Sequence, residues 1–161
     1  MIEITSLNSD DWERWRDMRL NALAEAPYAF CSSLSEWQGA GEQSWRDRLS
    51  EVSLNLIAKF DGDDAGMVSG MASEDEVELL SMWVAPFARG RGIGDALITA
   101  ILEWASSERK LRLVLRVLNG NDRAESLYVR HGFEHEQSSL ETNGALIQER
   151  LMVWKASPQS S

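Results

Sequence analysis

The residues best suited to chemistry lie in the segment Arg89-Gly90-Arg91-Gly92-Ile93-Gly94. Glycine lets backbone N–H groups come close to a ligand, and the N-terminus of a helix adds about half a positive charge. The segment follows an apolar run at 79–84 and precedes an amphipathic run at 93–105, so we expect it to join a strand to a helix. This pattern predicts a binding site for the phosphate groups of a cofactor.

Two common phosphate-binding motifs do not fit this segment. A P-loop requires Gly-Lys followed by Ser or Thr, whereas Gly94 is followed by Asp95. Gly90 and Gly92 supply the first half of a dinucleotide fingerprint, but its third glycine falls on Asp95. The segment does match the pattern Arg/Gln-x-x-Gly-x-Gly, through Arg89, Gly92 and Gly94.

A second segment, residues 121–133, reads Asn-Asp-Arg-Ala-Glu-Ser-Leu-Tyr-Val-Arg-His-Gly-Phe. It follows the pattern Asn-x-x-Ala-x-x-Leu-Tyr-x-x-x-Gly-Phe. Taken together, the two segments resemble the GNAT superfamily of acetyl-CoA-dependent N-acetyltransferases, and the resemblance covers residues 78–133. It implies that acetyl-CoA serves as the acetyl donor.

The resemblance also implies where coenzyme A would bind. Backbone amides near 82–84 would hold the pantetheine arm and polarise the thioester carbonyl, and residues 89–94 would bind the pyrophosphate. Asn121 would bond the pantetheine arm, cap its helix, or do both. The cofactor-binding residues expected on this basis are Met82, Trp83, Val84, Arg89, Gly90, Arg91, Gly92, Ile93, Gly94, Asn121, Ala124 and Tyr128.

Two residues are candidates for proton transfer. The family tyrosine that Tyr128 resembles points at the sulfur of coenzyme A and can protonate the departing thiolate; otherwise Tyr128 is a core tyrosine with a bonded hydroxyl. Glu78 stands as far before Arg89 as the catalytic glutamate of the histone-acetylating members, and is either the base or a solvated carboxylate. A base is needed because deprotonating a lysine-like amine at pH 7 costs about 4–5 kcal/mol.

The expected reaction is direct transfer of the acetyl group from acetyl-CoA to a primary amine of a small molecule or peptide, in a ternary complex. The alternative is a non-catalytic acyl-CoA-binding or sensing domain of the same fold. The acceptor site is expected at 24–45 and the last two strands. Four aromatic residues either line it or pack in the core: Tyr28, Phe30, Trp37 and Trp83. No metal site is expected, because His131 and His135 lack the spacing of metal ligands and are expected at the surface.

Composition restricts the partners. A formal net charge of −10 argues against nucleic acid and membrane surfaces, although Arg89, Arg91 and Arg123 make a local basic spot next to glycine or asparagine turns. No apolar run approaches the roughly 18 residues that span a bilayer. The N-terminus lacks the basic region of a signal peptide, and the single cysteine, Cys31, suits a reducing cytoplasm. We therefore expect a cytoplasmic protein; a homodimer is left open.

The elements expected around these motifs make an α/β (α+β), GNAT-like fold. It has a mixed, mostly antiparallel twisted sheet of about seven strands flanked by about four helices, in one N-acetyltransferase domain at 1–155 with a flexible tail at 156–161. The helix after Arg91 should link two parallel strands. Expected strands are 2–6, 53–60, 66–73, 76–85, 111–118, 133–138 and 145–154; expected helices are 10–24 (Ser9 or Asp10 as N-cap), 42–51, 92–109 and 122–131 (capped by Gly132).

Overall fold

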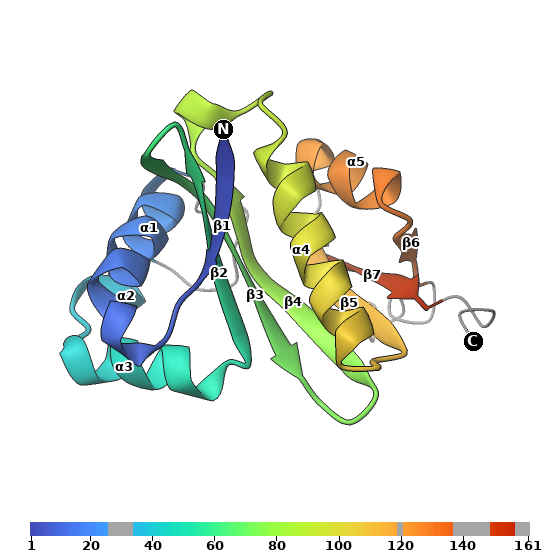
Figure 1. The fold of residues 1–161 in the computed structure, drawn as a ribbon, viewed down its shortest axis with the longest axis horizontal. Helices are drawn as coiled ribbons and strands as arrows, with labels where there is room; N and C mark the ends of the chain where they lie inside the picture. Colours follow the sequence, from blue (N-terminus) through green and yellow to red (C-terminus); the bar gives the residue numbers. More distant parts are fainter. Residues whose placement is uncertain (26–33, 119–120, 137–148, 157–161) are drawn as a thin grey trace.

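The computed structural model describes residues 1–25, 34–118, 121–136 and 149–156. This part holds one seven-stranded sheet and five α-helices (Figure 1). The mixed α/β architecture is the one predicted. The strands are β1 Ile2–Ser6, β2 Leu54–Phe60, β3 Asp63–Ala72, β4 Glu76–Val84, β5 Arg112–Leu118, β6 Glu134–His135 and β7 Glu149–Lys155; the helices are α1 Trp12–Glu25, α2 Leu34–Gln38, α3 Glu42–Glu51, α4 Ile93–Ser107 and α5 Asp122–Arg130, with short 3-10 turns η1 Ser9–Asp11 and η3 Pro86–Ala88.

The sheet order is β1-β2-β3-β4-β5-β7-β6, and neighbouring strands are antiparallel except for β4 and β5. The parallel pair is linked through α4, as predicted. β4 and β5 pair only where Glu76–Glu78 lie beside Arg112–Val114. Beyond Glu78 the two strands share no register, which leaves room between them for a cleft.

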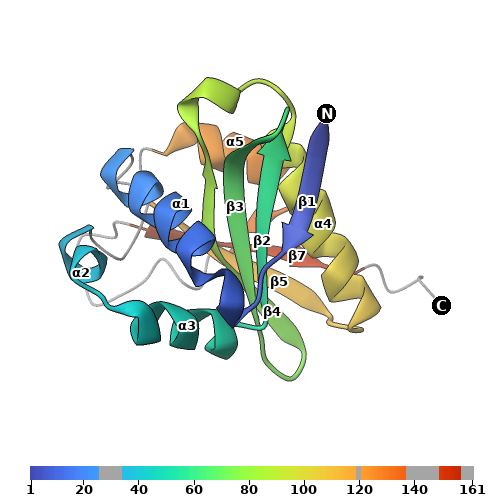
Figure 2. The same ribbon diagram turned by 60° about the vertical axis from the view of Figure 1, so that its left-hand side comes forward.

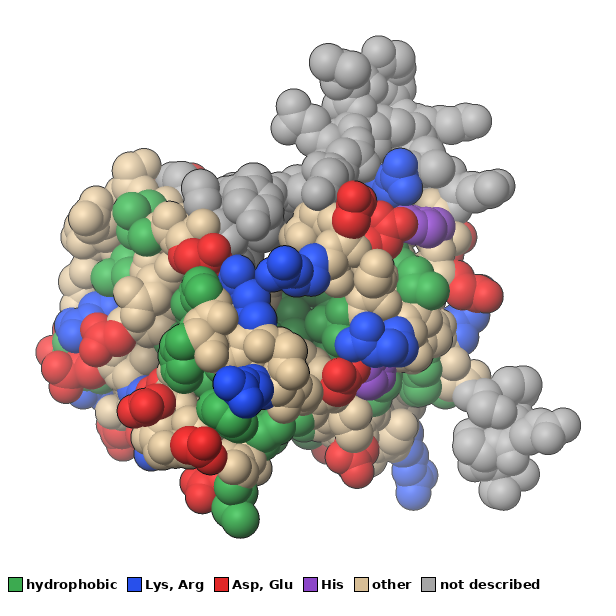
Figure 3. All heavy atoms as spheres, turned by 90° about the horizontal axis from the view of Figure 1, so that it is seen from above, with side chains coloured by type: hydrophobic (Ala, Val, Ile, Leu, Met, Phe, Trp, Pro, Cys, Tyr) green, Lys and Arg blue, Asp and Glu red, His purple; other side chains and the backbone are tan. Residues whose placement is uncertain are grey.

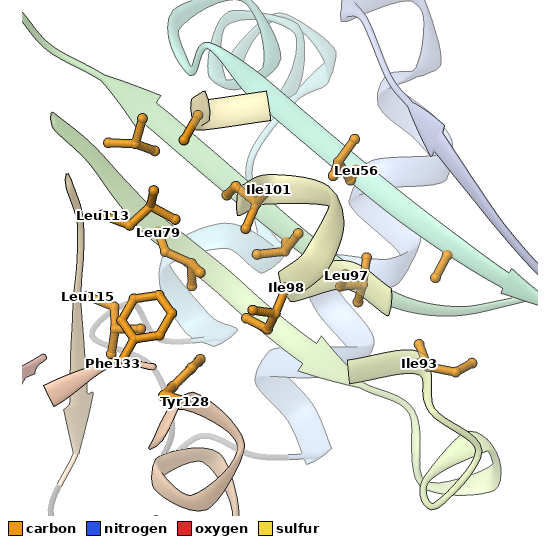
Figure 4. Packing of buried hydrophobic residues seen from close by; sticks show 14 of the residues in the cluster. Leu56, Leu79, Ile93, Leu97, Ile98, Ile101, Leu113, Leu115, Tyr128 and Phe133 are labelled. Carbon is orange, nitrogen blue, oxygen red and sulfur yellow. The ribbon is translucent and has the colours of Figure 1, made fainter. Parts of the chain in front are cut away.

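The helices cover both faces of the sheet, with α1, α2 and α3 on one side and α4 and α5 on the other (Figures 1 and 2). α4 buries one apolar stripe, because Ile93, Leu97 and Ile101 recur at helical spacing and are almost fully buried. Figure 4 shows this stripe against sheet residues such as Leu79. A second cluster on the other face contains Trp15 of α1 and, among others, Trp45 and Leu49 of α3 and Ile57, Met67 and Trp83 of the sheet.

Most element boundaries lie within two residues of the prediction, and three differences have a structural reason or a larger extent. Asn8 caps the first turn in place of Ser9 or Asp10: its side chain accepts from the Asp10 N–H, and Asp11 accepts from the Asn8 N–H. β3 begins at Asp63 rather than residue 66, so Asp61 and Gly62, both with positive φ, make a tight two-residue turn.

The third boundary is β6, which begins at Glu134 rather than residue 133 and spans Glu134–His135 within the described residues, while 137 and 138 of the predicted strand lie outside them. Much of the predicted strand 145–154 and of the tail lies outside the described residues. At the start of the predicted tail, the Ala156 N–H donates to the Leu111 carbonyl over 2.8 Å, so the described chain remains attached to the sheet there.

Candidate active site

A cleft of about 730 Å³ lies between β4, β5, the N-terminus of α4 and the start of α5. The two motifs singled out in the sequence meet in it, because 89–94 enters from β4 and 121–130 from β5. Figure 3 shows Lys and Arg side chains gathered around the hollow at this end of the molecule. The lining includes Leu79, Ser81, Met82, Trp83, Val84, Ala88, Arg89, Gly90, Gly92, Ile93, Gly94, Asp95, Arg116, Val117, Asn121, Asp122, Arg123, Ala124, Leu127, Tyr128 and Arg130.

β4 carries an irregularity where it borders the cleft. Its register with β3 shifts between Met67 and Ser69, and Ser81 adopts a left-handed backbone with φ of 55°. A serine rarely takes this conformation, so the surrounding contacts must hold it. The bulge thus lies in the part of β4, residues 81–84, that lines the cleft.

The glycine loop presents the bare N-terminus of α4. Gly90 and Gly92 have φ of 78° and 85°, where glycine is favoured, and the N-cap Gly92 offers no side-chain cap. Gly94 serves close packing, because a Cβ there would lie 3.1 Å from Leu127 of α5. Uncapped N–H groups together with the helix dipole favour an anion at this point.

Four arginines line the cleft of a protein whose net charge is −10. Two of them are bound to carboxylates: Arg89 donates to Glu25 over 2.6 Å, and Arg130 donates to Asp95 over 2.8 Å. Arg89 Nε also donates to the Val84 carbonyl. Arg116 and Arg123 also line the cleft, so four guanidinium groups and the helix N-terminus lie around it.

The hydrogen bonds to these carboxylates change their acidity. The Arg89 guanidinium, followed by the Trp83 indole, lowers the pKa of Glu25. Arg130, followed by His131, lowers the pKa of Asp95. Both carboxylates therefore stay ionised at neutral pH and hold their arginines at the rim of the cleft.

Tyr128 of α5 is buried at the inner end of the cleft and packs at 5.7 Å from the Phe133 ring. Burial raises the pKa of its phenol, so the hydroxyl stays protonated. Within the described residues this hydroxyl has no hydrogen-bond partner. Asn121 occupies the N-cap position of α5, yet its side chain makes no capping bond and lines the cleft. Both polar groups are thus available to a ligand.

The sequence profile of the acetyltransferase (GNAT) family matches residues 8–133. The chain belongs to this family. Among known proteins it is similar to the spore coat polysaccharide biosynthesis protein SpsD of Bacillus subtilis (strain 168), with 32% identity over 98 residues. That match covers 60% of this chain and 34% of the relative, so the chain spans about a third of the relative's length.

Solved structures share the GNAT fold along nearly the whole chain. A GNAT acetyltransferase from Streptococcus pneumoniae has a TM-score of 0.75 at 21% identity, covering 97% of this chain and 100% of that one. PaiA N-acetyltransferase from Thermoplasma acidophilum, in complex with coenzyme A, has a TM-score of 0.76 at 18% identity. The match covers 97% of this chain and 99% of that one. The ribosomal-protein-S18-alanine N-acetyltransferase from Escherichia coli has a TM-score of 0.71 at 20% identity. The match covers 99% of this chain and 98% of that one.

Two predicted site residues of this GNAT chain do not line the cleft. Glu78 alternates with Val77 and Leu79, which belong to the cluster under α4, so its side chain lies on the other face of β4. Arg91 lies over the Phe60 ring at 5.7 Å. The other predicted residues, from Met82 through Tyr128, all line the cleft.

Several lining residues of the GNAT chain were not predicted from sequence. Ser81 and Arg116 lie on strands and look like ordinary strand residues in the sequence. Asp95 and Arg130 are joined only by the packing of α4 against α5. The sequence did indicate a place in the cleft for Arg130, because this residue lies within the second motif, two positions after Tyr128.

The predicted aromatic wall of the GNAT chain is partly core. Trp83 is buried, and its Nε1 donates to Glu25 over 2.9 Å. Trp37 packs on Trp45 of α3, with ring centroids 4.7 Å apart. Tyr28 and Phe30 lie outside the described residues.

The predicted surface histidines make specific contacts. His131 lies 2.7 Å from Asp95 and is only 18% exposed, so it is half-buried rather than on the surface, while His135 lies 2.8 Å from Glu125. Across the described ranges, no three His, Cys, Asp or Glu side chains group as metal ligands. Over the same ranges, no helix has the length and apolar character needed to cross a bilayer.

Proposed function

We propose that this GNAT family member binds acetyl-CoA in the β4–β5 cleft and transfers its acetyl group to a primary amine of a small molecule or peptide. The observation that carries the proposal is that most residues of the segments 89–94 and 121–130, which are separated by a helix and a strand, line one cleft. A cytoplasmic location belongs to the same proposal and is supported by the single cysteine, Cys31.

The cleft fits the chemistry of coenzyme A. Its mouth combines lining arginines with the uncapped N-terminus of α4, which suits the pyrophosphate and the 3′-phosphate. Its interior is formed by apolar side chains and by the unpaired part of β4, which suits an extended amide chain. The backbone at 82–84 would hold the pantetheine arm, and Asn121 would add a polar contact.

The reaction joins the amine nitrogen to the acetyl carbon and breaks the carbon–sulfur bond. Tyr128 donates its proton to the departing thiolate, a role that suits a protonated phenol at the inner end of the cleft. An amine that arrives protonated first gives up one proton to Glu78, directly or through a water, on the face of the sheet opposite α4, where Glu78 lies. After the amine attacks, its nitrogen gives up a second proton, which replaces the one that Tyr128 has donated. No covalent intermediate with the enzyme is required.

Two measurements test this function. Calorimetry should detect CoA and acetyl-CoA binding at physiological salt, and thiol release from acetyl-CoA should then depend on an added primary amine. Screening an amine panel identifies the acceptor. Binding of CoA without amine-dependent thiol release would favour a non-catalytic sensing domain. The observation that supports this alternative is that Glu78 does not line the cleft. No binding of CoA or its acyl esters would overturn the proposal.

A further inference from the structure

Arg48 of α3 lies beneath the bulge of β4, on the face of the sheet away from α4. Its guanidinium donates to Asn55 Oδ1 at 2.9 Å, to Ser69 Oγ at 3.2 Å and to Ser81 Oγ at 3.3 Å. Burial lowers the pKa of Arg48 to about 10, so the group stays charged at neutral pH. One side chain therefore connects α3 to three consecutive strands.

The acceptors around this charge are neutral and belong to a buried network. Asn55 and Ser69 are 1% and 0% exposed, and Ser69 Oγ donates to Asn55 Oδ1 at 2.7 Å. Asn55 in turn donates to the carbonyls of Leu49 and Val52 at the end of α3. The guanidinium also lies 5.2 Å from the centroid of the Trp15 ring. Such a network has few alternative arrangements, so its geometry is fixed.

The network ends at the residue whose backbone is irregular. Ser81 has φ of 55°, lies within the shifted register between β3 and β4, and lines the cleft. Its hydroxyl is the contact that joins the bulge to Arg48. Regular pairing of β4 with β5 has already ended at Glu78, so β5 does not hold this part of β4.

We propose that Arg48 is a positioning residue that acts through Ser81 to fix the backbone of residues 81–84 along the cleft. It thereby sets the place of the pantetheine arm and of the thioester, without touching either. This inference rests on the proposed function, because it assumes that coenzyme A occupies the cleft. The pyrophosphate end is held separately, by the loop before α4.

The test compares two ligands in calorimetry: CoA, and adenosine 3′-phosphate 5′-diphosphate, which lacks the pantetheine arm. Arg48→Met should weaken CoA binding about tenfold and change binding of the fragment less than about twofold. Arg48→Lys, which keeps the charge but cannot reach three acceptors, should recover part of the loss. Ser81→Ala should weaken CoA binding selectively, and adding it to Arg48→Met should cause little further loss.

Arg14→Met is the matched control. Arg14 lies on α1, on the same face of the sheet, and its ion pair with Asp64 at 2.8 Å is also partly buried, but neither residue lines the cleft. The control should leave both affinities unchanged even if it lowers the melting temperature. Should Arg48→Met fail to fold, Arg48→Lys and Ser81→Ala still carry the test.

The outcomes separate the two proposals. If the wild-type protein binds neither ligand, the proposed function fails and this inference fails with it. If the wild-type protein binds both ligands and the Arg48 and Ser81 variants weaken both equally, or neither, the positioning role is overturned while the proposed function stands. The positioning role is also overturned if the double variant loses CoA affinity by the product of the two single losses, because Arg48 and Ser81 would then act independently.

Discussion

The carboxylate of Glu25, at the end of α1, bonds the guanidinium of Arg89 over 2.6 Å, although the two residues are 64 positions apart. The same carboxylate accepts from the Trp83 indole over 2.9 Å. A helix on one face of the sheet is thus joined to the loop that begins the phosphate motif. The side chains of Arg89 and Glu25 are 29% and 32% exposed, so the pair is only partly screened by water.

Glu25→Gln should therefore lower stability in a pH-dependent way. The pKa of Glu25 is lowered in the folded protein, so the ionised carboxylate stabilises the fold above its ordinary value of 4.5, and this contribution is lost as the pH falls through the lowered value. Urea unfolding at pH 7 should give the wild type a larger free energy of unfolding than Glu25→Gln, and the difference between the two proteins should shrink toward pH 3. An equal difference at both pH values would contradict the stabilising role of the ion pair.

Tyr128→Phe should separate binding from turnover. The phenyl ring keeps the packing on Phe133 but cannot donate a proton, so we expect kcat to fall about a hundredfold while Kd for CoA stays within about twofold. Because burial raises the phenol pKa, wild-type kcat should show no loss of activity from tyrosine ionisation near pH 10. Thiol-release kinetics measure both effects. Unchanged turnover in the variant would remove Tyr128 from the chemistry.

Arg123→Gln should weaken CoA binding about three- to fivefold in low salt, because an exposed charge beside a phosphate contributes up to about 1 kcal/mol. Raising the salt concentration should shrink this difference by screening. The matched control is Arg91→Gln, since Arg91 lies over Phe60 outside the cleft. Calorimetry at two salt concentrations measures the CoA affinity of both variants and of the wild type. An equal loss in both variants would restore Arg91 to the phosphate site.

Gly66→Ala should destabilise the fold by about 1–3 kcal/mol through overpacking. A Cβ at Gly66 would lie 2.9 Å from the Trp83 carbonyl and 3.1 Å from both Ile93 and Leu97 of α4. Gly39→Ala is the control, because a Cβ there has no neighbour within 4 Å. Chemical denaturation compares the two variants. A Gly66→Ala protein as stable as the control would mean that the Trp83 carbonyl and α4 both shift away from position 66 without cost.

Features carried by local pattern could be predicted from the sequence. The apolar stripe of α4 follows from helical periodicity, and the cleft residues at 89–94 and 121–128 follow from motifs whose glycines and polar groups are local. Gly132 caps α5 as expected, with φ of 95°. The helix, its apolar stripe and the position of Gly132 could be predicted because a few neighbouring residues determine each of them, whereas the binding roles of the motif residues stay predictions.

Features that depend on pairing could not be predicted in this way. The bulge at Ser81 exists because β3 and β4 slip in register, and a single strand sequence does not contain that register. The bonds from Arg48 and Glu25 join residues that only the tertiary fold brings together. The contact that requires glycine at position 66 likewise comes from the Trp83 carbonyl and from α4.

The early end of the β4–β5 pairing has a mechanical consequence. After three residue pairs, the edge of β4 that faces β5 has no partner in β5 and forms a border inside the molecule. An elongated ligand with amide groups can form hydrogen bonds with this edge of β4, as an additional strand would. Such a ligand would connect the β4 half of the sheet to the β5 half. Ligand binding should therefore raise the melting temperature and slow amide hydrogen exchange along β4 and β5.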